Sequence, residues 1–167
     1  MLKKILATAA LTALSAGTAH AAGNSATATG TATATVVAPL QITHTSGAAL
    51  SFGAFTVGTG GTVTVSQAGA GSVTGDVALV TGGTVAPDAF TVTGSAARLF
   101  NITTSTGNTV TTGGATPATM PLALSAPASG TLTGGTFALK VGGTLTVAAN
   151  QASGAYTGSY TVTVTYQ

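Results

Sequence analysis

Apolar residues alternate with threonine along most of the chain, and after residue 21 no stretch shows the spacing of an amphipathic helix. Strict alternation places apolar side chains on one face of a strand and threonine on the other, as in a half-buried strand. A first core strand is predicted at residues 36–43. The clearest later strands are predicted at residues 62–66, 90–93, 99–103, 122–125, 137–141, 144–148 and 160–166.

Clusters of glycine separate these predicted strands. They lie at residues 58–61, 82–83, 113–114, 134–135 and 142–143. We interpret them as hairpin turns that need positive φ. None of them follows a strand and opens a helix, as a phosphate-binding glycine loop does. Short strands and turns in this order predict an all-β fold, an antiparallel sandwich or barrel.

The stretch at residues 24–35 differs from the rest because its apolar positions hold only small side chains. Alanine or glycine alternates with threonine, so one face carries Ala26, Ala28, Gly30, Ala32 and Ala34. This pattern predicts an extended strand with small residues on its buried face. The composition is equally typical of a flexible low-complexity leader. Both interpretations remain open at this point.

The last predicted strand ends one residue before the end of the sequence. Tyr160, Val162, Val164 and Tyr166 share one face of it, and only Gln167 follows. We expect this strand to leave an unpaired edge and an open groove beside it. Exposed edges pair readily with another chain, and strand addition is a known mode of binding. The small-faced strand at residues 24–35 of an identical molecule would suit such a groove.

The first 21 residues have the pattern of a secretory signal peptide. Lys3 and Lys4 form a basic start, a short apolar run follows, and Ala19-His20-Ala21 matches the A-x-A cleavage pattern. The apolar run is shorter than the roughly 20 residues that a membrane helix needs. No transmembrane segment is expected elsewhere. We therefore expect an exported protein that begins at Ala22 and reaches the periplasm and then the cell surface or an extracellular fibre.

Removing that leader leaves a chain with almost no charge. Arg98 and Lys140 balance Asp76 and Asp88, so the formal side-chain charge from residue 22 onward is zero. So few basic residues argue against binding of nucleic acid, which needs many phosphate contacts. The absence of cysteine excludes a disulfide or zinc framework. A nearly uncharged surface favours self-association, as expected of a subunit that polymerises.

The ionisable side chains give little basis for catalysis. His44 has no carboxylate close to it in the sequence, so we interpret it as a surface or edge residue. Asp76 and Asp88 lie beside turn-like residues and are interpreted as aspartates that bond local backbone. A glycosidase needs paired carboxylates at a controlled separation, which these two would have to supply. We predict no catalytic residue, no metal and no cofactor.

Aromatic residues could instead form a carbohydrate-stacking platform. Tyr160 and Tyr166 share the parity of one strand, which favours packing in the core or groove. Tyr156 lies in a predicted loop, where it can pack across the turn.

Several strings resemble the bacterial DUF4402 domain. They are Val36-Val-Ala-Pro-Leu-Gln-Ile through Leu50-Ser-Phe-Gly53, Phe90-Thr-Val-Thr-Gly94, Val141-Gly-Gly-Thr-Leu145, and the C-terminal string from Gln151 to Tyr166. The resemblance covers nearly the whole chain after the leader. The domain is itself poorly characterised, so the resemblance implies little about function.

The C-terminal string also resembles pilin subunits of chaperone–usher fimbriae, including the archaic spore-coat-U-like pilins. Those pilins have a penultimate tyrosine and a glycine fourteenth from the end, which Tyr166 and Gly154 match. The resemblance implies an incomplete immunoglobulin-like sandwich that lacks its last strand. A periplasmic chaperone would lend that strand and hold the Gln167 carboxylate, and an outer-membrane usher would assist assembly. Val162, Val164 and Tyr166 would face the core.

The same resemblance implies how such subunits join. The N-terminal extension of the next subunit would replace the chaperone strand, with Ala28, Gly30, Ala32, Ala34 and Val36 filling the groove. The expected organisation is a signal peptide at 1–21, an extension at 22–35 and a β-sandwich at 36–167. We therefore expect a non-enzymatic structural subunit of a pilus or fibre, forming a homopolymer. The alternative is a self-contained, adhesin-like surface or matrix sandwich, in which 22–35 is an ordinary first strand or leader.

Overall fold

The computed structural model describes residues 23 and 25–167, and the predicted signal peptide lies outside them. The chain divides into two units, Met1–Thr35 and Val36–Gln167. In the first unit, the described residues are exposed and belong to no strand or helix. All strands lie in the second unit, and no helix occurs among the described residues. The strands are β1 (Gln41–His44), β2 (Ser51–Phe52), β3 (Phe55–Val65), β4 (Gly71–Leu79), β5 (Val85–Ala86), β6 (Asp88–Thr93), β7 (Leu99–Thr104), β8 (Asn108–Thr111), β9 (Thr119–Ser125), β10 (Ser129–Thr131), β11 (Thr136–Val147) and β12 (Val162–Tyr166).

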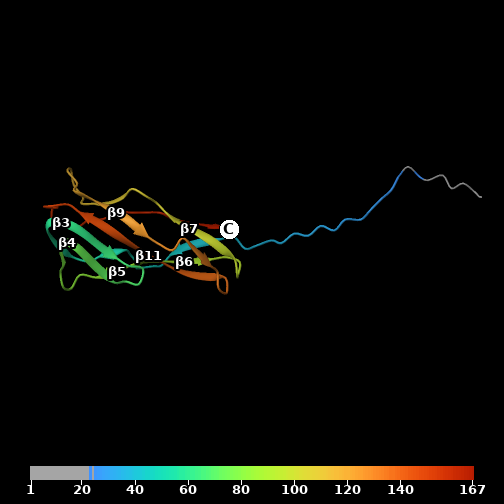
Figure 1. Ribbon diagram of the computed structural model, residues 1–167, viewed down its shortest axis with the longest axis horizontal. Helices are drawn as coiled ribbons and strands as arrows, with labels where there is room; N and C mark the ends of the chain where they lie inside the picture. Colours follow the sequence, from blue (N-terminus) through green and yellow to red (C-terminus); the bar gives the residue numbers. More distant parts are fainter. Residues whose placement is uncertain (1–22, 24) are drawn as a thin grey trace, which may run out of the picture. The chain divides into compact units, whose positions relative to one another are not determined.

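Three antiparallel sheets build the second unit (Figure 1). The largest has the order β1-β6-β11-β3-β4, and β9 joins it by pairing with both β11 and β8. A three-stranded sheet has the order β10-β7-β12, and β2 pairs with β5. This arrangement confirms the predicted all-β class and the antiparallel β-sandwich.

Strand β11 connects the two halves of the domain. Its first part, Thr136 to Val141, pairs with β6, and its second part, from Gly142 onward, pairs with β9 and β3. The prediction of two strands separated by a turn at residues 142–143 is therefore wrong. A Cβ on Gly142 would collide with the Val65 carbonyl oxygen. Glycine stands here because neighbouring backbone approaches closely, and not because the chain turns.

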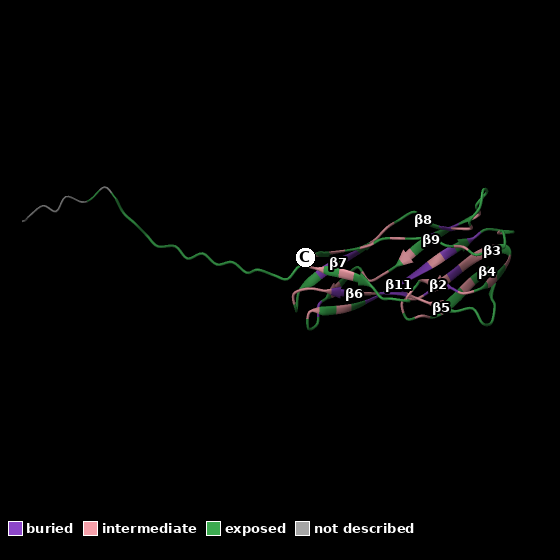
Figure 2. Ribbon diagram, turned by 180° about the vertical axis from the view of Figure 1, so that it is seen from behind, coloured by how far each residue is buried: buried purple, intermediate pink, exposed green. Residues whose placement is uncertain are grey.

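Two apolar cores lie along the length of the domain (Figure 2). Each forms because alternation sends every second side chain of its strands inward. The first core consists of Phe52, Val63, Val65, Val77, Val110, Met120, Leu122, Leu145 and Val147. The second core consists of Val92, Phe100, Ile102, Leu132, Leu139 and Val141.

The glycine clusters have different roles. Gly134 and Gly135 have φ of 61° and 84° and form the turn between β10 and β11, as predicted. Gly82, with φ of 92°, lies in a predicted turn as well. The prediction of a turn at residues 58–61 is wrong, because these residues lie within β3. The pairing of β3 with β4 shifts register there, between Val57 and Gly60.

The first core strand is shorter than predicted. It covers Gln41–His44 and not residues 36–43. Pro39 has no backbone N–H to give to a ladder. The N–H of Ala38 donates to the Ser95 hydroxyl oxygen at 2.7 Å, so it makes no strand bond either. Val36, at 96 % exposure, contributes to neither core of its own domain.

Candidate functional site

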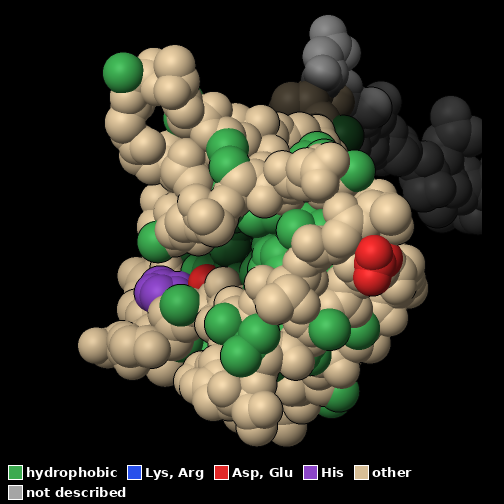
Figure 3. Space-filling model, turned by 90° about the vertical axis from the view of Figure 1, so that its left-hand side faces the viewer, with side chains coloured by type: hydrophobic (Ala, Val, Ile, Leu, Met, Phe, Trp, Pro, Cys, Tyr) green, Lys and Arg blue, Asp and Glu red, His purple; other side chains and the backbone are tan. Residues whose placement is uncertain are grey.

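An apolar groove opens beside the first core. Its volume is about 950 Å³, and its walls come from residues 48–57 and 151–158. The floor is formed by core side chains, namely Val110, Met120, Leu122 and Leu145. Figure 3 shows hydrophobic side chains deep inside the hollow. The floor residues are buried, whereas Leu50, Phe55 and Tyr156 on the walls are only partly buried, so the groove leaves apolar surface open to solvent.

Hydrogen bonds hold the wall at residues 151–158 in place. The Gln151 side-chain amide donates to the Thr119 carbonyl at 3.2 Å and to the Tyr156 hydroxyl at 2.8 Å. That hydroxyl donates in turn to the Ala152 carbonyl at 2.6 Å. Thr157 bonds Thr111 of β8 through both backbone groups, at 2.8 and 2.9 Å. Tyr156 packs against the first core, as its predicted loop position allowed.

A polar cluster of His44, Asp88 and Tyr160 borders one part of the groove. Asp88 is buried, and its Oδ1 accepts from His44 Nε2 and from the Ala89 N–H, both at 2.7 Å. Its Oδ2 accepts from the Tyr160 hydroxyl at 2.6 Å. The His44 ring also meets the edge of Phe90, at a centroid distance of 4.9 Å. Three donors from the protein thus satisfy one buried carboxylate, and the cluster joins β1, β6 and the segment that precedes β12.

This cluster corrects the interpretation of Asp88. Asp88 is not a turn aspartate, because it lies buried in β6 and bonds side chains from two other segments. His44 is exposed on the edge strand β1, as interpreted, and the fold supplies a carboxylate partner from 44 residues away. Asp76 is not in a turn either. It lies in β4, and its Oδ2 accepts from the Thr59 N–H at 3.0 Å, where β3 is irregular.

Burial raises the pKa of the Tyr160 phenol well above its ordinary value, and the hydrogen bond to Asp88 and the charge of Asp88 raise it further. Above pH of about 10 an unfolded chain loses this proton, whereas the folded chain keeps it. The folded state then binds more protons, so the free energy of unfolding falls as pH rises.

Replacing Tyr160 with phenylalanine should therefore weaken the alkaline loss of stability. Between about pH 9 and pH 11 the urea midpoint of the wild type should fall more steeply than that of Tyr160→Phe. At pH 7 the variant should be less stable by about 1 kcal/mol, because the bond to Asp88 is lost. Urea unfolding across this range tests both expectations, and equal slopes in the two proteins would contradict the first.

The C-terminal strand presents a free backbone edge. Ser105 N–H donates to the Thr161 carbonyl, and Gln167 N–H donates to the Leu99 carbonyl, so odd-numbered residues bond β7. Backbone groups of alternate residues face opposite edges of an antiparallel strand. Those of Val162 and Val164 therefore face away from β7. Among the described residues no strand pairs with that edge, because β12 ends the order β10-β7-β12.

The side chains of β12 point inward, in agreement with the alternation. Val162, Val164 and Tyr166 pack against the second core, as does Tyr160. Tyr160 precedes the strand, which begins at Val162 and not at residue 160 as predicted. Beyond them, the Gln167 side-chain amide donates to Asn101 Oδ1 at 2.7 Å. Gly154, the residue fourteenth from the end, lines the groove.

Tyr166 forms a clasp with the start of the domain. Its hydroxyl accepts from the Ser95 N–H at 2.8 Å and donates to the Ala38 carbonyl at 3.0 Å. Gly94 leaves room for this hydroxyl, because a Cβ there would collide with it. The clasp fixes the point at which the chain enters the β-sandwich.

The residues predicted to fill a neighbour's groove are in no regular secondary structure. Ala28, Gly30, Ala32, Ala34 and Val36 are exposed and belong to no strand. An open groove was expected beside the last strand, but the sequence did not indicate the floor and walls of the observed groove, because they come from distant segments with the pattern of ordinary core strands and loops. The sequence feature that could have pointed to the polar cluster beside the groove was Asp88, a charged residue at the start of an apolar run.

The described residues show no feature of a metal centre or a membrane helix. Within residues 23 and 25–167, His, Asp and Glu side chains form no group of three that could hold a metal ion. In the same residues, no helix is long and apolar enough to cross a membrane.

Together, the fold and the groove define a small antiparallel β-sandwich that is open along one apolar side. The sequence model of DUF4402, a domain of unknown function, matches residues 40–166, and the chain belongs to that family. No curated protein and no solved structure matched the chain.

Proposed function

We propose that this protein is a structural subunit of an extracellular pilus or fibre. In such a fibre, the N-terminal extension of one copy fills the groove of the next copy. The observation that carries this proposal is the open groove of about 950 Å³, whose floor consists of residues of the first core. Covering apolar surface of this kind removes it from water and stabilises the assembly.

The free edge of β12 supports strand insertion as the way to cover the groove. Tyr160 contributes to the groove wall, and the strand continues from it through Val162 and Val164. The outward backbone groups of these two valines can accept and donate main-chain hydrogen bonds to an added strand. Cα atoms of β1 come within 8 Å of β12, so the added strand would also lie close to β1.

The extension has the composition that such a site needs. One face of residues 26–34 holds only alanine and glycine, and the other holds threonine, which tolerates both solvent and strand geometry. Small side chains bury little apolar area, so main-chain hydrogen bonds would supply much of the binding. A nearly uncharged surface places no strong repulsion between identical copies.

Assembly of such a fibre would begin with export of the chain. A signal peptide at 1–21 would export the chain to the periplasm. There a chaperone would hold the groove strand Gly154, Tyr160, Val162, Val164, Tyr166 and Gln167, and an outer-membrane usher would help deliver the homopolymer to the surface.

Removing the extension should abolish assembly. Light scattering and negative-stain microscopy would compare the chain that starts at Ala22 with a chain that starts at Val36. We expect fibres or ladders from the longer chain only, and lower stability of the shorter one. Stable monomers of both chains would contradict the proposal and favour a self-contained, adhesin-like surface or matrix protein.

A further inference from the structure

The chain enters the β-sandwich through a short entry segment, residues 36–39, that is fixed at its inner end. Both backbone groups of Ala38 are bonded: its N–H donates to the Ser95 hydroxyl at 2.7 Å, and its carbonyl accepts from Tyr166 at 3.0 Å. The bond between the Ser95 N–H and the Tyr166 hydroxyl closes this clasp. Ala38 therefore cannot reorient without breaking bonds to two other segments.

The residue types of the same segment also restrict its backbone conformation. Pro39 has a fixed φ and restricts the residue before it, Ala38, to extended conformations. Val36 and Val37 are β-branched and favour extended backbone over turns. A tight reversal of the chain within this segment is therefore opposed by four successive residues.

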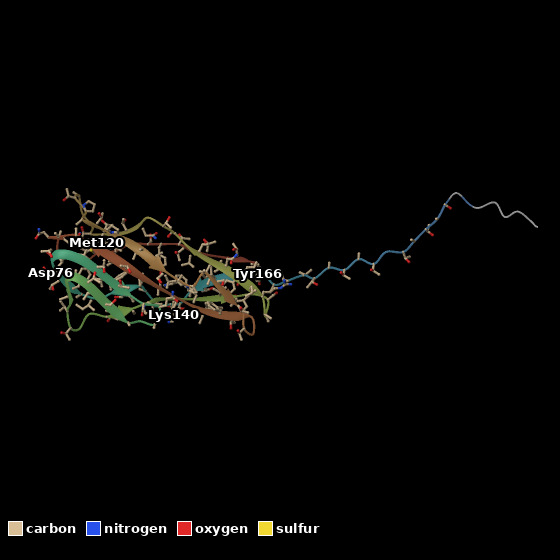
Figure 4. All side chains as sticks on the ribbon, in the orientation of Figure 1. Asp76, Met120, Lys140 and Tyr166 are labelled. Carbon is tan, nitrogen blue, oxygen red and sulfur yellow. The ribbon has the colours of Figure 1, made fainter. Side chains whose placement is uncertain are left out.

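The entry segment and the groove lie at different places along the domain. Figure 4 shows Tyr166 at the end of the domain opposite Asp76, and Met120, on the groove floor, in the half toward Asp76. Tyr160, which lines the groove, precedes Tyr166 by six residues, a distance on the order of 20 Å along an extended strand. An extension that reversed at Ala38 would use residues 30–35 to cover that distance. Ala32 and Ala34 would then lie outside the groove of their own domain.

The extension of a subunit and the extension of a second copy would compete for the same groove. An extension tethered to its own domain would have an effective concentration in the millimolar range, if it could reach the groove. At micromolar protein it would then exclude the extension of any other copy. We infer that the clasped entry segment keeps Ala32 and Ala34 out of the groove of their own domain, so that only the extension of a second copy of the chain can place these two residues there. The inference rests on the proposed function.

A flexible insertion tests this inference. About twelve Gly and Ser residues placed between Val37 and Ala38 would span roughly 20 Å and permit a reversal. The inserted variant should remain monomeric, and its assembly at micromolar protein should fall about a hundredfold. The chain has no cysteine, so Ala32→Cys supplies a single reporter. Maleimide should label it in wild-type monomers and should fail to label it in monomers of the inserted variant.

The same insertion between Gly113 and Gly114, in the exposed loop that joins β8 and β9, is the matched control and should assemble as the wild type does. An entry-segment variant that assembles at the wild-type rate, with its cysteine labelled in the monomer, would overturn the inference and leave the proposed function intact. Wild-type monomers with a protected cysteine would also overturn it. A wild-type chain that never assembles, with its cysteine always labelled, would instead contradict the proposed function itself.

Discussion

Replacing Ala32 with aspartate is expected to abolish fibre assembly while leaving the β-sandwich folded. Ala32 lies on the small-residue face of the extension, which would be buried against the apolar groove floor of the neighbour. A carboxylate placed there would lose its water without gaining a cation, because the groove lining contains no Lys or Arg. Burying an unpaired charge costs several kcal/mol, and about 3 kcal/mol already weakens binding more than a hundredfold.

Thr31→Asp is the matched control for this experiment. It adds the same charge one residue away, on the face that would remain in water. Sedimentation and negative-stain microscopy should show fibres of Thr31→Asp and monomers of Ala32→Asp. Equal assembly of the two variants would mean that the groove does not distinguish the two faces of the extension. In that case the alternation of residues 26–34 would have no role in binding.

Replacing Gly142 with alanine is expected to destabilise the domain by about 3 kcal/mol. Its Cβ would collide with the Val65 carbonyl oxygen and lie 3.0 Å from the Ser66 carbonyl carbon. Both are backbone atoms, so β11 and β3 would have to separate along their shared ladder. Urea unfolding, followed by circular dichroism, measures the change.

Gly113→Ala is the control, because a Cβ at Gly113 meets nothing within 4 Å. At such a site the substitution reduces the freedom of the unfolded chain and should be neutral or stabilising by about 0.5 kcal/mol. Comparable destabilisation of both variants would argue that loss of glycine flexibility, and not close packing at β11, explains the result.

The alternation of apolar residues with threonine predicted the strands of the two cores well. Strands β6, β7 and β9 cover the predicted stretches, and buried residues alternate with exposed or partly buried ones along β7 and β9. Strand β4 was missed because its sequence, Gly-Ser-Val-Thr-Gly-Asp-Val-Ala-Leu, has few apolar positions and lies at a sheet edge. Edge strands receive fewer packing contacts and therefore leave a weaker pattern in the sequence.

Glycine pairs were ambiguous because two physical requirements select the same residue. Gly134 and Gly135 adopt positive φ in a turn. Gly142 and Gly143 lie within a continuous strand, where backbone from β3 and β9 leaves no room for a Cβ. Only the three-dimensional pairing distinguishes a turn from a close approach.

An open groove was expected, but the segments that form the observed groove and its polar cluster could not be predicted from the sequence, for a related reason. His44, Asp88 and Tyr160 span more than a hundred residues, and none carries a local motif. The inward face of β12 was predictable, since it depends on alternation alone. Its free edge was expected from the position of the strand in the sequence, and the hydrogen-bond pattern identifies the residues that form it.

The single strand β11 has a mechanical consequence. It pairs with β6 over its first half and with β3 and β9 over its second half, so one continuous backbone of about 40 Å runs beneath both cores. Tension applied along the length of the domain would act parallel to β11 and perpendicular to its hydrogen bonds. Those bonds would then resist together in shear and would not open one after another. A pulled domain should therefore yield first at its short strands, with β11 and its partners the last to separate.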